Sequence, residues 1–345
     1  MDPETSRRPN DASTARVASS DRHERFPVRR QGRARKELER YWIIGAWLVM
    51  TGIYSALRPS TFATIGTLQT VLGSQTALVF LVLALMCTIA TGEFVDLSVA
   101  SLLGLSATVV PVLYVFHGTS LVVASAIGIA IGAAAGALNG FFVVVLGVNT
   151  IVITLGMSTF LLGIALLISH LNAVSGLPPS FADIAVANVW GLPIAFYYGL
   201  LLVLVFAYIL VFTPLGRHME FVASNREVSR LAGVRVNRIR FGAFVMAGLF
   251  CGVGGVIVSA GLGGFDPSSS VGYLLPTVSA VFLSATVIQP GRFNPLGAII
   301  GLYFLATGEL GLEILGAAGW VADVFYGAAL ITAVALSSVL GGRAS

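Results

Sequence analysis

Long apolar stretches follow one another along most of this chain, and short polar segments separate them. A helix needs about 20 mainly apolar residues to cross a bilayer. We predict membrane-spanning helices at 41–57, 68–90, 99–116, 120–140, 150–168, 193–211, 241–261, 273–288, 295–312 and 320–340, although the region 98–119 could re-enter the membrane instead of crossing it. The predicted fold is therefore all-α, a polytopic membrane protein with about ten transmembrane helices.

The longest polar interruption of this pattern is the segment 212–240, FTPLGRHMEFVASNREVSRLAGVRVNRIR. Its residues Ser224, Asn225, Arg226 and Glu227 fit a capping box, in which the serine and glutamate side chains bind free backbone N–H groups at a helix start. Gly233 fits the helix end, because glycine takes the left-handed conformation at low cost. The sequence therefore predicts one short helix between Ser224 and Gly233.

This short helix has the features of a docking element. Val228, Leu231 and Ala232 are spaced three and four residues apart, which gives the helix one apolar face. The segment holds six arginines, among them Arg226 and Arg230, against two glutamates. The positive-inside rule places such a segment on the cytoplasmic side. We expect a capped amphipathic helix at this surface to bind another protein.

Composition supports a membrane protein with a polar tail. The 345 residues are 56% hydrophobic and 10% charged, and the mean hydropathy is +0.90. Residues 1–40 hold 11 of the 20 Lys+Arg and 7 of the 16 Asp+Glu but few large apolar residues, which predicts a disordered basic cytoplasmic tail before a membrane domain at 41–341. The basic charge is explained by membrane orientation, so we expect contact with the lipid bilayer and no nucleic-acid partner.

Motifs for chemistry are missing from the sequence. Lys36 is the sole lysine and follows Arg35, so the chain contains no Gly-Lys-Ser/Thr loop for ATP phosphates. No histidine begins an HExxH, no CxxC occurs, and Cys87 and Cys251 lie in apolar stretches. We therefore expect no catalytic residues, no metal site, no cofactor and no enzymatic activity of the chain itself.

Polar residues at membrane depth are costly and are candidates for function. Such residues, which serve either a pathway or the structure, are Glu93, Asp96, Ser98, Asn139 and Asn149. Asp96 has a structural alternative, because an aspartate can cap a helix that begins near Leu97. Three acidic residues toward the outer face are either solvated helix ends or contacts to an external partner: Glu309, Glu313 and Asp323.

Glycines repeat at every fourth position in one predicted span. They are Gly128, Gly132, Gly136 and Gly140. A face of small residues lets membrane helices approach closely, so we expect these glycines to pack against another helix. Lining of a pathway is the alternative.

Four segments resemble one family in order along residues 41–340: TGEFVDLSVASLLGLSA, LNGFFVVVLGVNTIVITLGMSTFLLGIALLIS, GRHMEFVASNREVSRLAGVRVNRIRF and PGRFNPLGAIIG. They are similar to permease subunits of bacterial ABC importers for ribose, xylose and related monosaccharides, within the branched-chain amino acid/ribose permease superfamily. The resemblance implies that 224–233 is the coupling helix that binds a separate ATP-binding subunit.

The same resemblance implies a location in the bacterial inner membrane with both termini cytoplasmic. It also implies an extracytoplasmic solute-binding protein and a second permease subunit, identical or not. The chain departs from the family pattern at Ser224, where glycine is usual, and at Val228 and Ser229, where alanines are usual. Val95 is an extra residue, and Ala100 replaces a glycine.

Three classes of function follow. The first is the permease subunit of an importer for a monosaccharide, or alternatively for branched-chain amino acids or nucleosides. The second is a secondary transporter that uses an ion gradient through Glu93 and Asp96. The third is a membrane anchor or scaffold, which would have no transported substrate.

Overall fold

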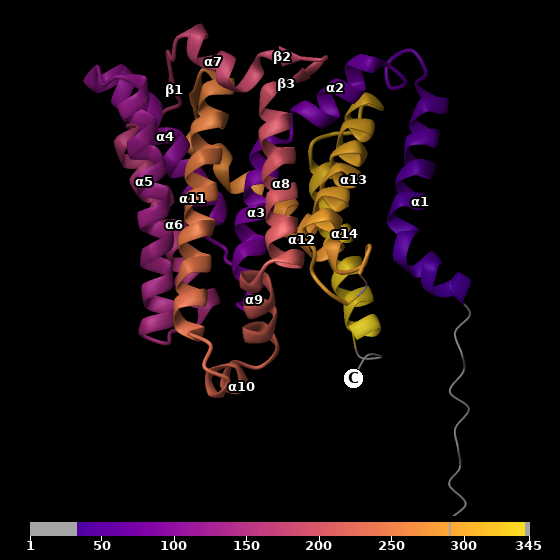
Figure 1. Ribbon diagram of the computed structural model, residues 1–345. Coiled ribbons are helices and arrows are strands. Elements are labelled where there is room, and N and C mark those ends of the chain that lie inside the picture. The colour runs from indigo at the N-terminus through magenta and orange to yellow at the C-terminus, as the bar shows by residue number, and fades with distance from the viewer. Residues whose placement is uncertain (1–32, 290, 342–345) are drawn as a thin grey trace, which may run out of the picture.

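The computed structural model describes residues 33–289 and 291–341, and it is a bundle of long helices that run side by side (Figure 1). The residues described form helices and only four two-residue strands. The all-α fold predicted from the sequence is confirmed. The longer helices that run through the bundle are α1 (Arg33–Leu57), α3 (Thr76–Ile89), α4 (Val99–His117), α5 (Leu121–Gly140), α6 (Thr150–Ile168), α8 (Ile194–Phe212), α11 (Val236–Leu262), α13 (Pro295–Ile314) and α14 (Trp320–Gly341).

Within the described residues, seven helical stretches are long and apolar enough to cross a membrane. Two shorter apolar helical stretches, Tyr41–Leu57 and Trp320–Ala335, correspond to the first and last predicted spans. The span predicted at 273–288 corresponds to the shorter helix α12 (Leu274–Ser284), which a 3-10 helix, η2 (Pro267–Tyr273), precedes. The start of α1 at Arg33 precedes the predicted domain boundary, and residues 1–32 of the predicted tail lie outside the described residues.

The second predicted span is not one helix. It is divided at Ser74 and Gln75 into α2 (Ile65–Gly73) and α3. Thr64 caps the start of α2, because its side chain accepts a hydrogen bond from the Thr67 N–H at 3.1 Å. The break falls on residues 73–76, GSQT, a short polar interruption that the prediction of a continuous span at 68–90 did not take into account.

Helix α3 lies in the centre of the bundle. Every residue of α3 from Ala77 to Ile89 is buried, and the helix packs against α4, α8, α11, α12 and α13. A helix that is apolar on all sides is expected in such a position. Most buried residues of α3 belong to the main hydrophobic core, together with residues such as Leu102, Leu302 and Leu305, and Phe80 belongs to a second cluster.

Helices α5 and α11 approach each other closely along their glycines. A Cβ atom built on Gly132 would lie 2.6 Å from the Gly248 carbonyl oxygen and 2.7 Å from the Gly252 Cα. The Ser106 hydroxyl of α4 donates to the Gly252 carbonyl at 2.9 Å and joins a third helix to this contact. Beyond Gly140, α5 continues as a π-helix, η1 (Phe141–Val145).

Short elements cover one end of the bundle. β1 (Val174–Ser175) pairs antiparallel with β4 (Gly264–Phe265), and β2 (Asn188–Val189) pairs antiparallel with β3 (Leu192–Pro193). They lie near α7 (Pro179–Val186) at the top of Figure 1. These elements belong to the segment between α6 and α8 and to the end of α11.

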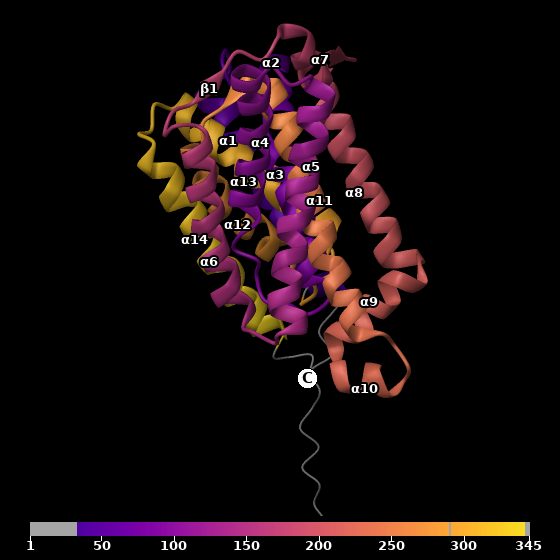
Figure 2. The ribbon, with the colours of Figure 1, turned by 90° about the vertical axis from the view of Figure 1, so that its left-hand side faces the viewer.

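Two short helices lie at the opposite end, α9 (Pro214–Ser224) and α10 (Arg226–Leu231). Helix α9 lies beside the ends of the long helices, and α10 extends beyond them, as Figures 1 and 2 show. The start of α1 and the end of α14 lie at this same end of the bundle (Figure 1). The segment 212–240 therefore leaves the helical bundle, as its polarity predicted, but it contains two helices where the sequence analysis expected one.

Candidate functional site

Helix α10 begins with an asparagine cap. The Asn225 Oδ1 accepts hydrogen bonds from the backbone N–H groups of Glu227 at 3.0 Å and Val228 at 3.1 Å. Ser224 is instead the last residue of α9, and its hydroxyl donates to the Glu220 carbonyl at 2.9 Å. The predicted capping box of Ser224 and Glu227 is therefore wrong, because α9 holds Ser224 in helical conformation and Asn225 is the first extended residue.

The end of α10 lies where the sequence predicted it. Gly233 has a φ of +82°, its N–H donates to the Arg230 carbonyl at 3.0 Å, and the next N–H, of Val234, donates to the Ser229 carbonyl at 3.0 Å. These two bonds form a Schellman motif. Caps at both ends define the conformation of a helix that is only six residues long.

The outward face of α10 is apolar and exposed. Val228 is 48% exposed and Leu231 is 80% exposed. Glu227 and Arg230 form an exposed ion pair of 3.2 Å beside them. Large apolar side chains outside the bundle, with charges around them, are typical of a surface that binds another protein.

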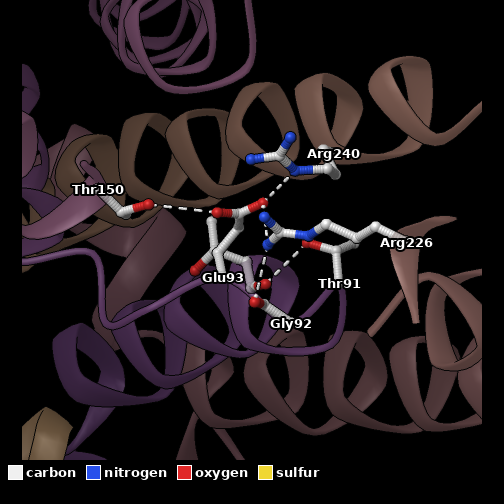
Figure 3. A network of polar contacts seen from close by, with 7 residues as sticks. Thr91, Gly92, Glu93, Thr150, Arg226 and Arg240 are labelled. Carbon is white, nitrogen blue, oxygen red and sulfur yellow. Dashed lines mark hydrogen bonds and ion pairs between the residues drawn. The ribbon is translucent and has the colours of Figure 1, made fainter. Parts of the chain in front are cut away.

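A buried carboxylate connects α10 to the rest of the bundle. Glu93 lies in the segment between α3 and α4, residues 90–98, which we call the α3–α4 connection. Figure 3 shows its carboxylate between two guanidinium groups. The Glu93 Oε1 accepts from Arg226 Nη2 at 3.0 Å and also from the Arg240 Nε. The Thr150 hydroxyl donates to Glu93 Oε2 at 3.2 Å.

The two arginine partners of Glu93 differ in their exposure to solvent. The Glu93 side chain is 2% exposed, whereas Arg240 is 12% and Arg226 is 41% exposed. Burial of a carboxylate is costly unless charged partners and hydrogen bonds compensate. Two arginines and one hydroxyl supply that compensation here, and they come from α10, α11 and α6.

A second buried network lies three residues further along the same connection. The Asp96 Oδ1 accepts from the Ser98 N–H at 2.9 Å and from the Ser98 hydroxyl at 2.6 Å. The Asn139 side-chain amide of α5 donates to the same hydroxyl at 2.7 Å. The α4 helix begins at Val99, not near Leu97, so Asp96 caps the turn before the helix instead of its first turn.

The structure thus brings four of the five predicted polar residues together on or beside the α3–α4 connection, namely Glu93, Asp96, Ser98 and Asn139. Asn149 is exposed, although it directly precedes Thr150, the hydroxyl partner of Glu93. Its side chain accepts from the Ile151 N–H at 2.9 Å and caps α6. The buried Asn139 Oδ1 has no hydrogen-bond partner among the described residues.

The sequence analysis did not identify several partners in this site. Arg240, Thr150 and the hydroxyl of Thr154, which accepts from the Leu97 N–H at 3.1 Å, are distant from Glu93 and Asp96 in the chain. No local pattern predicts such contacts. For α9 a local signal did exist, because Thr213 followed by Pro214 is a typical helix start, with threonine as cap and proline at the first helical position.

Three of the four glycines singled out in α5 face α11, and Gly128 faces α4. A Cβ on Gly136 would lie 2.9 Å from the Gly248 Cα, and one on Gly140 would lie 3.0 Å from the Phe241 ring. A Cβ on Gly128 would lie 3.1 Å from the Ser106 hydroxyl of α4. These positions are helix contacts in the described structure, and none of the four glycines lines any of its five main cavities.

Acidic residues gather at the opposite end of the bundle. The Tyr326 hydroxyl donates to Glu309 Oε2 at 2.5 Å. Glu313 and Asp323 line, together with these two residues, a cavity of about 390 Å³ between α12, α13 and α14. A neighbouring cavity of about 550 Å³ shares Glu309 and Tyr326 and extends to the break between α2 and α3.

The chain is similar to known transport proteins along most of its length. Residues 67–334 match the family described as branched-chain amino acid transport system / permease component. The D-allose transport system permease protein of Escherichia coli is 27% identical over 299 residues, which are 85% of this chain and 89% of that protein. No solved structure matches the chain.

Two further relatives are permease proteins for other solutes. The L-arabinose ABC transporter permease protein of Azospirillum brasilense is 29% identical over 308 residues, covering 89% of this chain and 90% of the relative. The autoinducer 2 import system permease protein of an Enterobacter species is 31% identical over 298 residues, covering 86% and 85%. With a family match over most of its residues, the chain belongs to the family of branched-chain amino acid transport system permease components.

Proposed function

We propose that this chain is the membrane permease subunit of an ATP-binding-cassette importer that carries a monosaccharide. The names of its relatives, which specify allose, arabinose and ribose, support this choice of solute. The similarity to each of them extends over more than four fifths of the chain. A monosaccharide is favoured over branched-chain amino acids because individual relatives that match most of the chain are named for sugars, whereas branched-chain amino acids are named in the description of the whole family.

The exposed apolar face of α10 supports the inference that a separate subunit binds here and supplies the energy for transport. The chain contains no Gly-Lys-Ser/Thr loop for ATP, so ATP hydrolysis must occur on a separate subunit. Val228 and Leu231 offer that subunit a capped helix beyond the bundle. We infer that Ser224, Asn225, Arg226, Glu227, Val228, Arg230, Leu231 and Gly233 form the segment that binds it.

The arrangement of charges supports a bacterial inner-membrane location with this end of the bundle in the cytoplasm. Arginines gather at this end, and the positive-inside rule assigns such an end to the cytoplasm. Arg217, Arg226 and Arg230 lie on α9 and α10, and Arg235 and Arg238 lie at the start of α11. Both chain termini would then be cytoplasmic. The acidic end with Glu309 would face the extracytoplasmic solute-binding protein, and a second permease subunit would complete the pathway.

In this function, ATP binding changes the position of the partner subunits and displaces α10. The helices then open the pathway to one side of the membrane and afterwards to the other. The displacement can drive transport only if α10 binds its partner differently in the two states. An ion-gradient mechanism through Glu93 has less support, because two arginines already neutralise that carboxylate.

Uptake by intact cells tests the solute class. A strain from which this permease alone is deleted, and the same strain complemented with it, are given radiolabelled D-ribose, D-allose, L-arabinose, leucine or adenosine. We expect complementation to restore uptake of a sugar. Restored uptake of leucine or adenosine, with none of the sugars affected, contradicts the monosaccharide assignment.

A further inference from the structure

Three helices contact one buried carboxylate, that of Glu93. The hydrophobic pattern of the chain does not explain why this charged group is buried. Glu93 accepts from Arg226 at the first position of α10, from Arg240 near the start of α11, and from Thr150 at the first position of α6. Arg226 Nη2 also donates to the Gly92 carbonyl at 2.9 Å. Every one of these contacts joins the α3–α4 connection to an element at the α10 end of the bundle.

The two arginines are suited to different tasks. Arg240 is nearly buried, at 12% exposure, so its ion pair with Glu93 is protected from solvent. Arg226 is 41% exposed, and water can replace Glu93 as its partner at low cost. Arg240 therefore holds the carboxylate in place, while the contact with Arg226 can break and form again as α10 moves.

Backbone contact accompanies the ion pair. Gly92 has a φ of +73°, and a Cβ atom there would lie 2.8 Å from the Cα of Ala223, in the last turn of α9. The end of α9 thus lies directly against the α3–α4 connection. A displacement of α9 and α10 toward the bundle must move residues 90–98, and a displacement away from it must break the Arg226 contacts.

The connection passes such a movement on to other helices. Its Leu97 N–H donates to the Thr154 hydroxyl of α6 at 3.1 Å, and its Ser98 hydroxyl accepts from the Asn139 amide of α5 at 2.7 Å. Ser98 also precedes the first residue of α4. Residues 90–98 therefore contact α4, α5 and α6 in addition to α10.

From these contacts we infer that Glu93 is a positioning residue for energy coupling. Through its contact with Arg226 it transmits the displacement of α10 to the α3–α4 connection, and the connection transmits it to α4, α5 and α6. The inference rests on the proposed function, since it requires that a partner subunit moves α10. It adds a residue outside the docking segment to the coupling machinery.

A purely structural Glu93 would affect folding but not the ratio of transport to ATP hydrolysis. The test therefore uses the whole importer in proteoliposomes, with its ATP-binding subunit and solute-binding protein. Uptake of D-ribose, D-allose or L-arabinose, whichever the wild type accumulates, is measured beside ATP hydrolysis. The variants are Glu93→Gln, Arg226→Gln, their double variant and Arg226→Lys, with Arg217→Gln on exposed α9 as the control for lost charge.

We expect Glu93→Gln and Arg226→Gln each to lower sugar uptake per ATP hydrolysed by about tenfold, within the range of typical coupling between sites. If both act through their mutual contact, the double variant loses about tenfold and not about a hundredfold. Arg226→Lys keeps the charge and should restore most of the coupling. Arg217→Gln should behave like the wild type.

Additive losses in the double variant, or unchanged uptake per ATP in both single variants, overturn the inference. Where Glu93→Gln does not fold, Glu93→Asp replaces it in the double-variant comparison with Arg226→Gln, because the shorter side chain keeps the charge beside Arg240 but draws it away from Arg226. A wild-type importer that shows no ATP-dependent uptake of any sugar overturns the proposed function itself. The two failures are therefore distinguishable.

Discussion

Glu93 and Arg226 are separated by 133 residues in the chain, and the Arg226 Nη2 lies 3.0 Å from the Glu93 Oε1. This contact joins the α3–α4 connection to a helix that extends beyond the bundle. The two arginines that contact Glu93, Arg226 and Arg240, differ in exposure. That difference gives a prediction for the stability of the protein that is separate from transport.

Loss of Arg240 should destabilise the protein more than loss of Arg226. Arg240→Gln removes the buried partner of Glu93, and we expect a loss of roughly 1–3 kcal/mol, less than for a fully unpaired buried charge because Arg226 remains. Arg226→Gln removes a half-exposed partner and should cost about 0–1 kcal/mol. Thermal unfolding of the purified variants in one detergent measures both. An equal effect of the two substitutions contradicts the assigned roles.

The cap of α10 can be tested by paired alanine substitutions. Asn225→Ala removes the acceptor of two backbone N–H groups and should cost about 1 kcal/mol of local stability. Ser224→Ala removes only a hydroxyl bonded within α9 and should have little effect. Hydrogen exchange of the Glu227 and Val228 amides, followed by mass spectrometry, should rise only in Asn225→Ala. Faster exchange in Ser224→Ala alone would favour the capping box expected from the sequence.

The exposed end of α10 should determine binding of the ATP-binding subunit. Leu231→Asp places a charge at the most exposed apolar position of this helix, and we expect the amount of ATP-binding subunit that co-purifies with the permease to fall at least about tenfold, as for a residue at the centre of an interface. The permease alone should elute from size-exclusion chromatography as the wild type does. Undiminished co-purification would show that the subunit binds elsewhere.

The close packing of α5 against α11 can be tested with two glycine substitutions in α11. Gly248→Ala would place a Cβ 2.9 Å from the Gly136 Cα, so the two backbones must separate. Gly242→Ala is the matched control, because a Cβ at Gly242 has no atom within 4 Å. We expect Gly248→Ala to lose about 1–3 kcal/mol and Gly242→Ala to be neutral. Similar unfolding temperatures for both variants contradict this packing.

Sequence reasoning identified the elements whose signals are local. Apolar stretches long enough to span a bilayer predicted most of the bundle, and the change in polarity at 212–240 predicted where the chain leaves it. Gly233 marked the end of α10 correctly because a positive φ favours glycine. The resemblance to permeases was confirmed by the family match over 67–334.

Features that depend on tertiary contacts could not be predicted in this way. Ser224 and Asn225 are both good caps, and the choice between them depends on α9, whose extent the sequence analysis did not foresee. The break between α2 and α3 did have a local signal, because residues 73–76 read GSQT and interrupt the apolar stretch, but the sequence analysis carried the span across it. Glu93 was identified as a costly polar residue, but its partners lie far along the chain.

The most direct test of the account compares accumulation of sugar with and without the ATP-binding subunit. The purified permease is reconstituted in liposomes with the solute-binding protein, and uptake of labelled D-ribose, D-allose and L-arabinose is measured with and without the ATP-binding subunit and ATP. We predict concentrative uptake only when both are present. Concentrative uptake by the permease under an ion gradient, with no ATP-binding subunit added, would contradict the central claim.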